Sequence, residues 1–194
     1  MLDYDYEKYF DRPEKREHAL RKAKIDEKFL SGLADVPTLN IGSGITTRLQ
    51  TPHIHKLVCG DISSASVKLL QSEGIEAVCF DARNEWPFPD NSFEQIIAID
   101  VFEHLGQVNG FLKELTRVSK KGAVIVIGIP LLNNWRNYLS LLFMTTHNVQ
   151  YDEHPRMFFD KDIKSIFQKA GFKLDNVKYL GMKGYGYYRF QCLK

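Results

Sequence analysis

Three groups of residues in the first half of the chain have the types that a nucleoside-binding pocket needs. They are the glycine pair Gly42 and Gly44, then Asp61, and then Asp81. Glycines let the backbone approach a ligand closely, and a carboxylate offers two acceptor oxygens to the two vicinal hydroxyls of a ribose. Asp61 lies 19 residues after Gly42, close to the spacing of about 20 at which an acidic residue binds ribose hydroxyls.

Each carboxylate also has a structural interpretation. Asp61 precedes a Ser-Ser-Ala-Ser run, so it could equally cap a helix. Asp81 can accept a hydrogen bond from an adenine amino group while the Ala82 amide donates to a ring nitrogen, or it can be a turn aspartate. The residue types alone leave both alternatives open.

The elements that must position these residues are short apolar runs, which we interpret as strands. The sequence predicts seven of them, over residues 38–41, 56–59, 77–80, 94–99, 123–129, 172–179 and 185–192. Segments with helical periodicity alternate with the first five, which is typical of βα units around a parallel sheet. We therefore expect an α/β fold, a Rossmann-like doubly wound seven-stranded sheet that is mostly parallel with an antiparallel last strand. The loops that carry the glycines and aspartates then open at one sheet edge.

Two further segments frame this sheet. Residues 1–35 are charged and read as a helical N-terminal extension, whereas residues 36–194 form the sheet domain. Late in the chain, Ile163 and Phe167 lie on one helical stripe, with Asp160 as the predicted N-cap and Gly171 as the C-terminal glycine.

Composition disfavours several classes of function. The 194 residues carry a formal net charge of +2, so nothing favours a nucleic-acid partner. No apolar segment approaches the roughly 20 residues that span a bilayer, and the first residues do not resemble a secretory signal. Three cysteines without metal-ligand spacing fit buried thiols in a reducing compartment. We expect a soluble, cytoplasmic protein with no membrane span.

The glycine loop favours a ligand without a pyrophosphate. A dinucleotide-binding loop would have a third glycine at position 47, where this chain has Thr47. A nucleoside such as S-adenosylmethionine does not require that glycine. A nicotinamide-dependent dehydrogenase is therefore disfavoured.

Five motifs carry a family resemblance. The segments N-I-G-S-G, C-G-D-I-S, F-D-A, P-F-P-D-N-S-F-E and D-V-F-E-H-L resemble, in order, the motifs of class I S-adenosylmethionine-dependent methyltransferases of the type 11 group, and the likeness extends from about Leu39 to Cys192. The resemblance implies that residues 36–194 are a class I methyltransferase domain with S-adenosylmethionine as cofactor and S-adenosylhomocysteine as product. It implies that the cofactor is bound by Asn40, Gly42, Ser43, Gly44, Asp61, Ile62, Asp81, Ala82, Asp100 and Val101.

The chain departs from the family at two positions. Asn40 stands where the family usually has an acidic residue, and Thr46 where it often has a glycine. The Asn40 amide can still accept a hydrogen bond, but it provides no charge for the ammonium group of the cofactor.

Methyl transfer from a sulfonium requires mainly an aligned acceptor and, where needed, a base. Glu103, His104 and His154 are the candidate catalytic residues. Alternatively, Glu103 and His104 are surface residues that open the next helix. His154 belongs to a polar cluster with His147, Asp152 and Glu153, whose spacing matches no metal-ligand pattern, so we expect no metal.

The segment I-P-L-L-N-N-W-R-N-Y-L-S-L-L resembles a narrower group, the MetW proteins, and a helical stripe from Trp135 to Phe143 lies in and just beyond it. Two functional hypotheses follow. The first is methyl transfer to a small-molecule acceptor. The alternative is a non-catalytic MetW-like partner or regulatory domain that retains the cofactor-binding fold and binds a protein partner.

Overall fold

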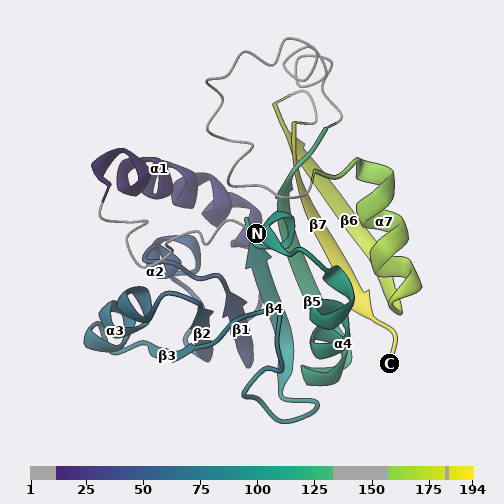
Figure 1. The fold of residues 1–194 in the computed structure, drawn as a ribbon, viewed down its shortest axis with the longest axis horizontal. Coiled ribbons are helices and arrows are strands. Elements are labelled where there is room, and N and C mark those ends of the chain that lie inside the picture. Colours follow the sequence, from purple (N-terminus) through teal and green to yellow (C-terminus); the bar gives the residue numbers. More distant parts are fainter. Residues whose placement is uncertain (1–11, 133–156, 182–183) are drawn as a thin grey trace.

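The protein is described here by a computed structural model that covers residues 12–132, 157–181 and 184–194. Its centre is one seven-stranded sheet with the strand order β3-β2-β1-β4-β5-β7-β6 (Figure 1). Strands β1 to β5 pair in parallel, and β7 is antiparallel to both β5 and β6. The predicted doubly wound sheet with an antiparallel last strand is therefore confirmed.

The strands lie close to their predicted positions. They are β1 Thr38–Ile41, β2 Leu57–Asp61, β3 Glu76–Cys79, β4 Phe93–Ile99, β5 Ser119–Pro130, β6 Phe172–Leu180 and β7 Tyr185–Cys192. The largest difference is in β5, which starts directly after the preceding helix and not after Gly122. This first part of β5 is shifted in register against β4, and Gly122 adopts a positive φ of 78° within it.

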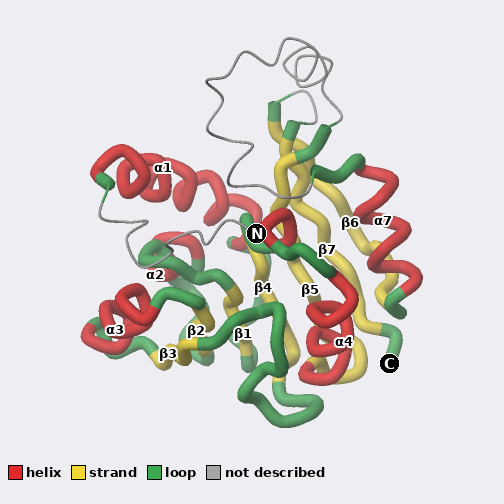
Figure 2. Tube along the Cα trace, viewed as in Figure 1, coloured by secondary structure: helices red, strands yellow, loops and turns green. Residues whose placement is uncertain are grey.

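Helices cover both faces of the sheet (Figure 2). They are α1 Pro13–Leu30, α2 Thr47–Gln50, α3 Ser64–Ser72, η2 Phe102–His104, α4 Val108–Val118 and α7 Asp160–Lys169. Successive side chains of β4 point to opposite faces of the sheet, so neighbouring residues join different hydrophobic cores. Ile96 packs with α4 and α7, whereas Ile97 packs with α1 and α3. The loops at the carboxyl ends of β1 to β4 lie between these helices and border a pocket.

The N-terminal helix α1 packs directly on the sheet. Its last residue, Leu30, is fully buried in the core that α3 also covers. Phe29 stacks on the ring of Tyr187 in β7, with ring centroids 4.0 Å apart. Burial of these apolar side chains fixes the direction of α1, so its preceding turns extend past the carboxyl ends of the strands.

The prediction for the start of α7 is wrong by one residue. The helix begins at Asp160, and Asp162 Oδ2 accepts a hydrogen bond from the backbone N–H of Phe159 at the N-cap. The Asp160 carboxylate instead accepts hydrogen bonds from Tyr179 Oη and Tyr188 Oη. Gly171 has a φ of 88° just after the helix, as predicted for its C-terminal glycine.

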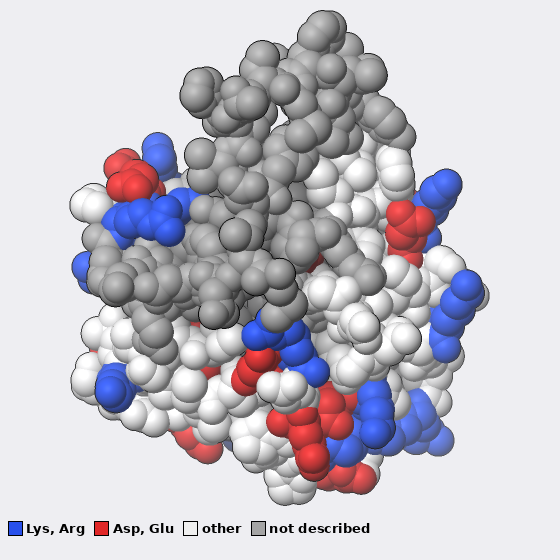
Figure 3. Space-filling model, in the orientation of Figure 1, with Lys and Arg blue, Asp and Glu red and all other residues white. Residues whose placement is uncertain are grey.

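Several predicted features lie outside the described residues. They are His154, its cluster with His147, Asp152 and Glu153, and the stripe from Trp135 to Phe143. Within the described ranges, no helix has the length and apolar character needed to cross a bilayer. On the described surface visible in Figure 3, basic and acidic side chains are intermixed.

Candidate functional site

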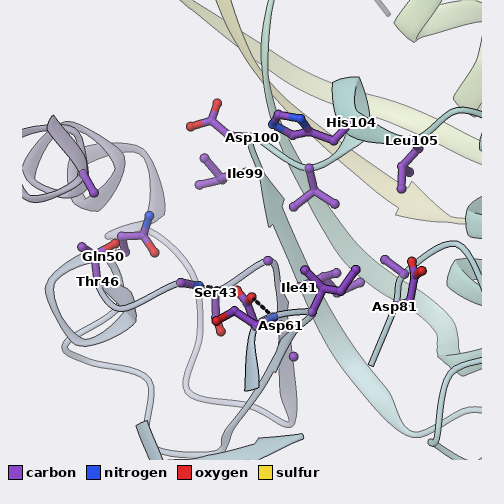
Figure 4. Close-up of a pocket in the computed structure, with 18 of the residues that line it drawn as sticks. Ile41, Ser43, Thr46, Gln50, Asp61, Asp81, Ile99, Asp100, His104 and Leu105 are labelled. Carbon is purple, nitrogen blue, oxygen red and sulfur yellow. Dashed lines mark hydrogen bonds between the residues drawn. The ribbon is translucent and has the colours of Figure 1, made fainter. Parts of the chain in front are cut away.

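One pocket gathers the residues that the sequence analysis singled out. It has a cavity volume of about 230 Å³ and opens at the carboxyl ends of β1, β2 and β4 and beside the loop that follows β3 (Figure 4). Nine of the ten predicted cofactor-binding residues line it: Gly42, Ser43, Gly44, Asp61, Ile62, Asp81, Ala82, Asp100 and Val101. Residues separated by up to 59 positions in the chain therefore face one space, as parallel strand order requires.

The glycine loop after β1 requires glycine at position 42. Gly42 has a φ of 62°, and a Cβ atom there would collide with Val101 Cγ2. Gly44, with a φ of 53°, donates its backbone N–H to Asp61 Oδ2 at 2.8 Å. The loop therefore exposes bare backbone to the pocket and is tied to the end of β2.

Asp61 is the residue that connects the first two loops. Its Oδ1 accepts the backbone N–H of Ser63 at 2.9 Å, in addition to the bond from Gly44 to Oδ2. The N-cap of α3 is Ser63, whose Oγ accepts the N–H of Ser66. The interpretation of Asp61 as a helix cap is therefore wrong, because Ser63 has that role.

Asp81 follows β3 on a different side of the cavity from Asp100 (Figure 4). Its carboxylate accepts hydrogen bonds from the backbone N–H, Nε and Nη2 of Arg83, at 2.9, 2.9 and 2.6 Å. Burial raises the pKa of Asp81, but the bonds from Arg83 outweigh burial and hold the pKa below its ordinary value. The turn interpretation of Asp81 is thus confirmed, and the same residue also faces the pocket.

Asp100, at the end of β4, has an unusual backbone conformation for a residue other than glycine, with a φ of 55°. Its Oδ1 accepts a hydrogen bond from Tyr185 Oη at 2.6 Å, and its Oδ2 lies 2.8 Å from Lys22 Nζ. Desolvation and the Asp100 charge raise the pKa of Tyr185 well above its ordinary value, so this hydroxyl keeps its proton and donates. Tyr185 and Lys22 thus fix the Asp100 carboxylate at the pocket.

Sequence analysis missed the charged residues that α1 adds to the pocket. Lys22 pairs with both Asp100 and Asp26, and Asp26 also accepts hydrogen bonds from Gln50 Nε2 and Tyr187 Oη. We refer to Lys22, Asp26, Asp100, Tyr185 and Tyr187 as the pocket cluster. Burial lowers the pKa of Lys22, but the carboxylates of Asp100 and Asp26 outweigh burial and raise it. No local motif marks Lys22 within the many charged residues of α1.

The candidate catalytic residues have different environments. His104 lines the pocket from η2 (Figure 4), whereas Glu103 is 1% exposed and does not border the cavity. Neither oxygen of Glu103 has a hydrogen-bond partner among the described residues. Burial and the Asp100 charge raise the pKa of Glu103 well above its ordinary value, so the site favours the protonated form of this carboxyl group.

Asn40 is the one predicted cofactor-binding residue that does not line the cavity. Its side chain is 2% exposed and donates from Nδ2 to Thr47 Oγ1. The amide therefore ties β1 to α2 behind the glycine loop. A direct role for Asn40 in binding a ligand remains a prediction.

Within the described parts of the chain, no group of three or more His, Cys, Asp or Glu side chains is arranged to hold a metal ion. The polar groups that border the cavity include carboxylates, backbone amides, hydroxyl groups, histidines, the Gln50 amide, the Arg83 guanidinium and the Lys22 ammonium. This donor set suits hydroxyl groups, an adenine edge and charged groups of an organic ligand.

Comparison with known proteins agrees with the resemblance to methyltransferases in the central part of the chain. Residues 39–127 match the family described as methyltransferase domain. Ajmaline N-methyltransferase of Rauvolfia serpentina is 33% identical over 99 residues, which are 46% of this chain and 34% of that protein. The match thus spans about a third of the length of this curated relative.

Solved structures share the whole fold. A methyltransferase from Thermotoga maritima, described as a "possible histamine N-methyltransferase", has a TM-score of 0.75 at 19% identity, covering 97% of this chain and 98% of that chain. A protein described as a "putative methyltransferase", solved in complex with the Haloferax volcanii Trm112 methyltransferase activator, has a TM-score of 0.74 at 12% identity, covering 96% of each chain. At these identities the likeness shows the fold and not the substrate.

Proposed function

We propose that the chain is a class I S-adenosylmethionine-dependent methyltransferase, and that it transfers a methyl group from S-adenosylmethionine to a small-molecule acceptor; the match of residues 39–127 to a methyltransferase domain and the shared fold support this. The observation that carries the proposal is that four loops converge on one pocket. Each loop contributes the residue type that one part of the cofactor needs.

The residues present fit the cofactor. Asp61 presents two carboxylate oxygens beside bare backbone, which suits the two ribose hydroxyls. Asp81 and Ala82 would contact adenine through a carboxylate and a backbone amide. Gly42 would lie against the methionine portion. A Cβ atom at this position would collide with Val101, so the loop presents bare backbone there. Ser43, Gly44, Ile62, Asp100 and Val101 complete the proposed binding surface.

The bound cofactor supplies an activated methyl group on its sulfonium. The protein has to align the acceptor and, for a protonated nucleophile, take up a proton. His104 is the proposed base because its ring lines the cavity. Glu103 is buried and does not border the cavity, so we give it no proton-accepting role in the free protein. His154 stays a prediction.

A small acceptor is favoured by the near-balanced formal charge of +2, which does not favour a nucleic-acid acceptor. The names of two relatives, Ajmaline N-methyltransferase and "possible histamine N-methyltransferase", both specify transfer to nitrogen. We therefore propose a small amine as the first acceptor class to test, and a reducing cytoplasm as the site of action, consistent with the three free cysteines.

Calorimetric titration with S-adenosylmethionine and S-adenosylhomocysteine tests the cofactor assignment. We expect both to bind. Substitution Asp61→Ala should weaken binding by about 1 to 3 kcal/mol, since it leaves ribose hydroxyls without an acceptor. Asp175→Ala is the matched control, because Asp175 pairs with Arg189 on β7 and is 62% exposed.

Two outcomes would count against the proposal. Absence of binding for both ligands at millimolar concentration rejects the cofactor assignment. If the cofactor binds but no labelled methyl group enters any small-molecule fraction of a cell extract, the enzymatic role fails and the regulatory MetW-like alternative gains support. Unchanged affinity in Asp61→Ala would leave Asp61 with a structural role, which includes its bonds to Gly44 and Ser63.

A further inference from the structure

The pocket cluster contains a lysine that none of the proposed roles uses. Lys22 Nζ lies 2.8 Å from Asp100 Oδ2 and 3.0 Å from Asp26 Oδ1. Lys22 belongs to α1, which precedes the residues 39–127 that match the methyltransferase domain. It nevertheless lines the same cavity as Asp61 and Asp81.

The two carboxylates that share Lys22 are held differently. Asp26 is 1% exposed and is also bound by Gln50 Nε2 at 2.9 Å and by Tyr187 Oη. The side chain of Asp100 is 37% exposed. Tyr185 donates to its Oδ1, and its Oδ2 contacts Lys22. Asp26 can therefore keep Lys22 in place while Asp100 Oδ2 exchanges Lys22 for a different cation.

A lysine beside an accessible aspartate complements an α-amino acid zwitterion. The ammonium of such a ligand can bind Asp100, and its carboxylate can bind Lys22, through charge-assisted hydrogen bonds. Asp26, Asp100 and Lys22 together carry a net charge of −1. That charge also favours a ligand with an additional positive centre, such as a sulfonium.

The position of the cluster agrees with this complementarity. Asp100 and Asp81 lie on different sides of the cavity (Figure 4), so a ligand with its adenine at Asp81 directs its other end toward Asp100. Asn40 cannot supply the missing negative charge, and its amide donates to Thr47 behind the loop. Tyr185 holds Asp100 in position, with its ring centroid 4.7 Å from Lys22 Nζ.

We propose that Lys22 and Asp100 together recognise the amino-acid end of the cofactor, so that α1 selects ligands that carry an intact zwitterion. This inference rests on the proposed function. It assigns to the N-terminal helix a specificity role, and it identifies Asp100 as the charge that compensates for Asn40.

The test compares two ligands that share the nucleoside and differ in the amino-acid group. S-adenosylhomocysteine has the zwitterion, and 5′-methylthioadenosine lacks it. In the full-length protein, Lys22→Met should weaken S-adenosylhomocysteine binding by about 10-fold to 100-fold and leave 5′-methylthioadenosine within about twofold. Lys22→Arg keeps the charge and should recover most of the lost affinity.

Lys120→Met is the matched control, because Lys120 pairs with Glu94 on the sheet, away from the cavity, and should affect neither ligand. Thermal unfolding of each variant verifies folding, and a Lys22→Met protein that does not fold is replaced by Lys22→Gln.

Equal weakening of both ligands by Lys22→Met, or no effect on either, overturns the inference and leaves the proposed function standing. Failure of the unsubstituted protein to bind either ligand instead overturns the proposed function.

Discussion

Two clusters of the molecule contain the same residue types and differ in what they can do. The pocket cluster combines Lys22 with Asp26, Asp100, Tyr185 and Tyr187. A second cluster, which we call the core cluster, combines Asp160 and Lys164 of α7 with Tyr179 and Tyr188 of the last two strands.

In the core cluster one carboxylate receives three donors. Asp160 accepts hydrogen bonds from Tyr179 Oη at 2.6 Å, Tyr188 Oη at 2.8 Å and Lys164 Nζ at 2.7 Å. The pocket cluster has a second carboxylate for its single ammonium, and it borders a cavity. Residue types therefore do not identify a ligand site. A carboxylate in excess of its ammonium partners beside a cavity does indicate a ligand site, because a charged ligand can then replace the internal partner.

The largest effect that tests this comparison is in the core cluster. Substitution Asp160→Ala removes the carboxylate that accepts hydrogen bonds from the buried Tyr188 hydroxyl and from Lys164. We expect the free energy of unfolding to fall by about 2 to 3 kcal/mol, with S-adenosylhomocysteine affinity unchanged within about twofold. Urea denaturation and calorimetry measure the two quantities. Weaker binding without a loss of stability would contradict the division between the clusters.

A smaller effect comes from removing one tyrosine hydroxyl from each cluster. Tyr188→Phe should lower the free energy of unfolding by about 1 kcal/mol and leave ligand affinity unchanged. Tyr185→Phe should weaken S-adenosylhomocysteine binding by about fivefold, because Asp100 loses the donor that orients its carboxylate. The same two measurements distinguish the variants. Identical profiles for both would remove the functional distinction.

The pH dependence of stability sharpens the comparison through two carboxyl groups. Burial and Asp100 raise the pKa of Glu103, beside the pocket cluster and near Lys22, above its ordinary value of 4.5. The folded protein then keeps a proton that the unfolded chain releases, so Glu103 makes stability fall as the pH rises above 4.5.

Asp160 has the opposite sign. Burial raises its pKa, but the bonds from Lys164, Tyr179 and Tyr188 outweigh burial and hold the pKa below 3.8. Its contribution is present above pH 3.8 and is lost as the pH falls below that value. Urea unfolding between pH 2.5 and 8 should show a shallower neutral slope in Glu103→Gln and a shallower acid slope in Asp160→Asn. A slope unchanged in either variant would exclude that group as its origin.

Much of the fold followed from local patterns. Continuous apolar runs predicted the seven strands, and helical periodicity predicted the helix that carries Ile163 and Phe167, because burial on a sheet face imposes those periods. The glycines and the carboxylates after β1, β2 and β3 were identified for a similar reason. Backbone conformation and strand order restrict which residues can stand there, so they leave a signature in the sequence.

The sequence by itself determined the sheet, the glycine loop and the identity of the acids that end the strands. Only the tertiary structure decided that α1 brings Lys22 to Asp100, that Tyr185 meets Asp100 across 85 positions and that Tyr187 meets Asp26 across 161. It also decided that Asn40 turns away from the cavity and that Glu103 is buried. A local pattern reports the period and conformation of its own segment, whereas charge pairing depends on which distant segments share a buried space, and no short stretch of sequence encodes that.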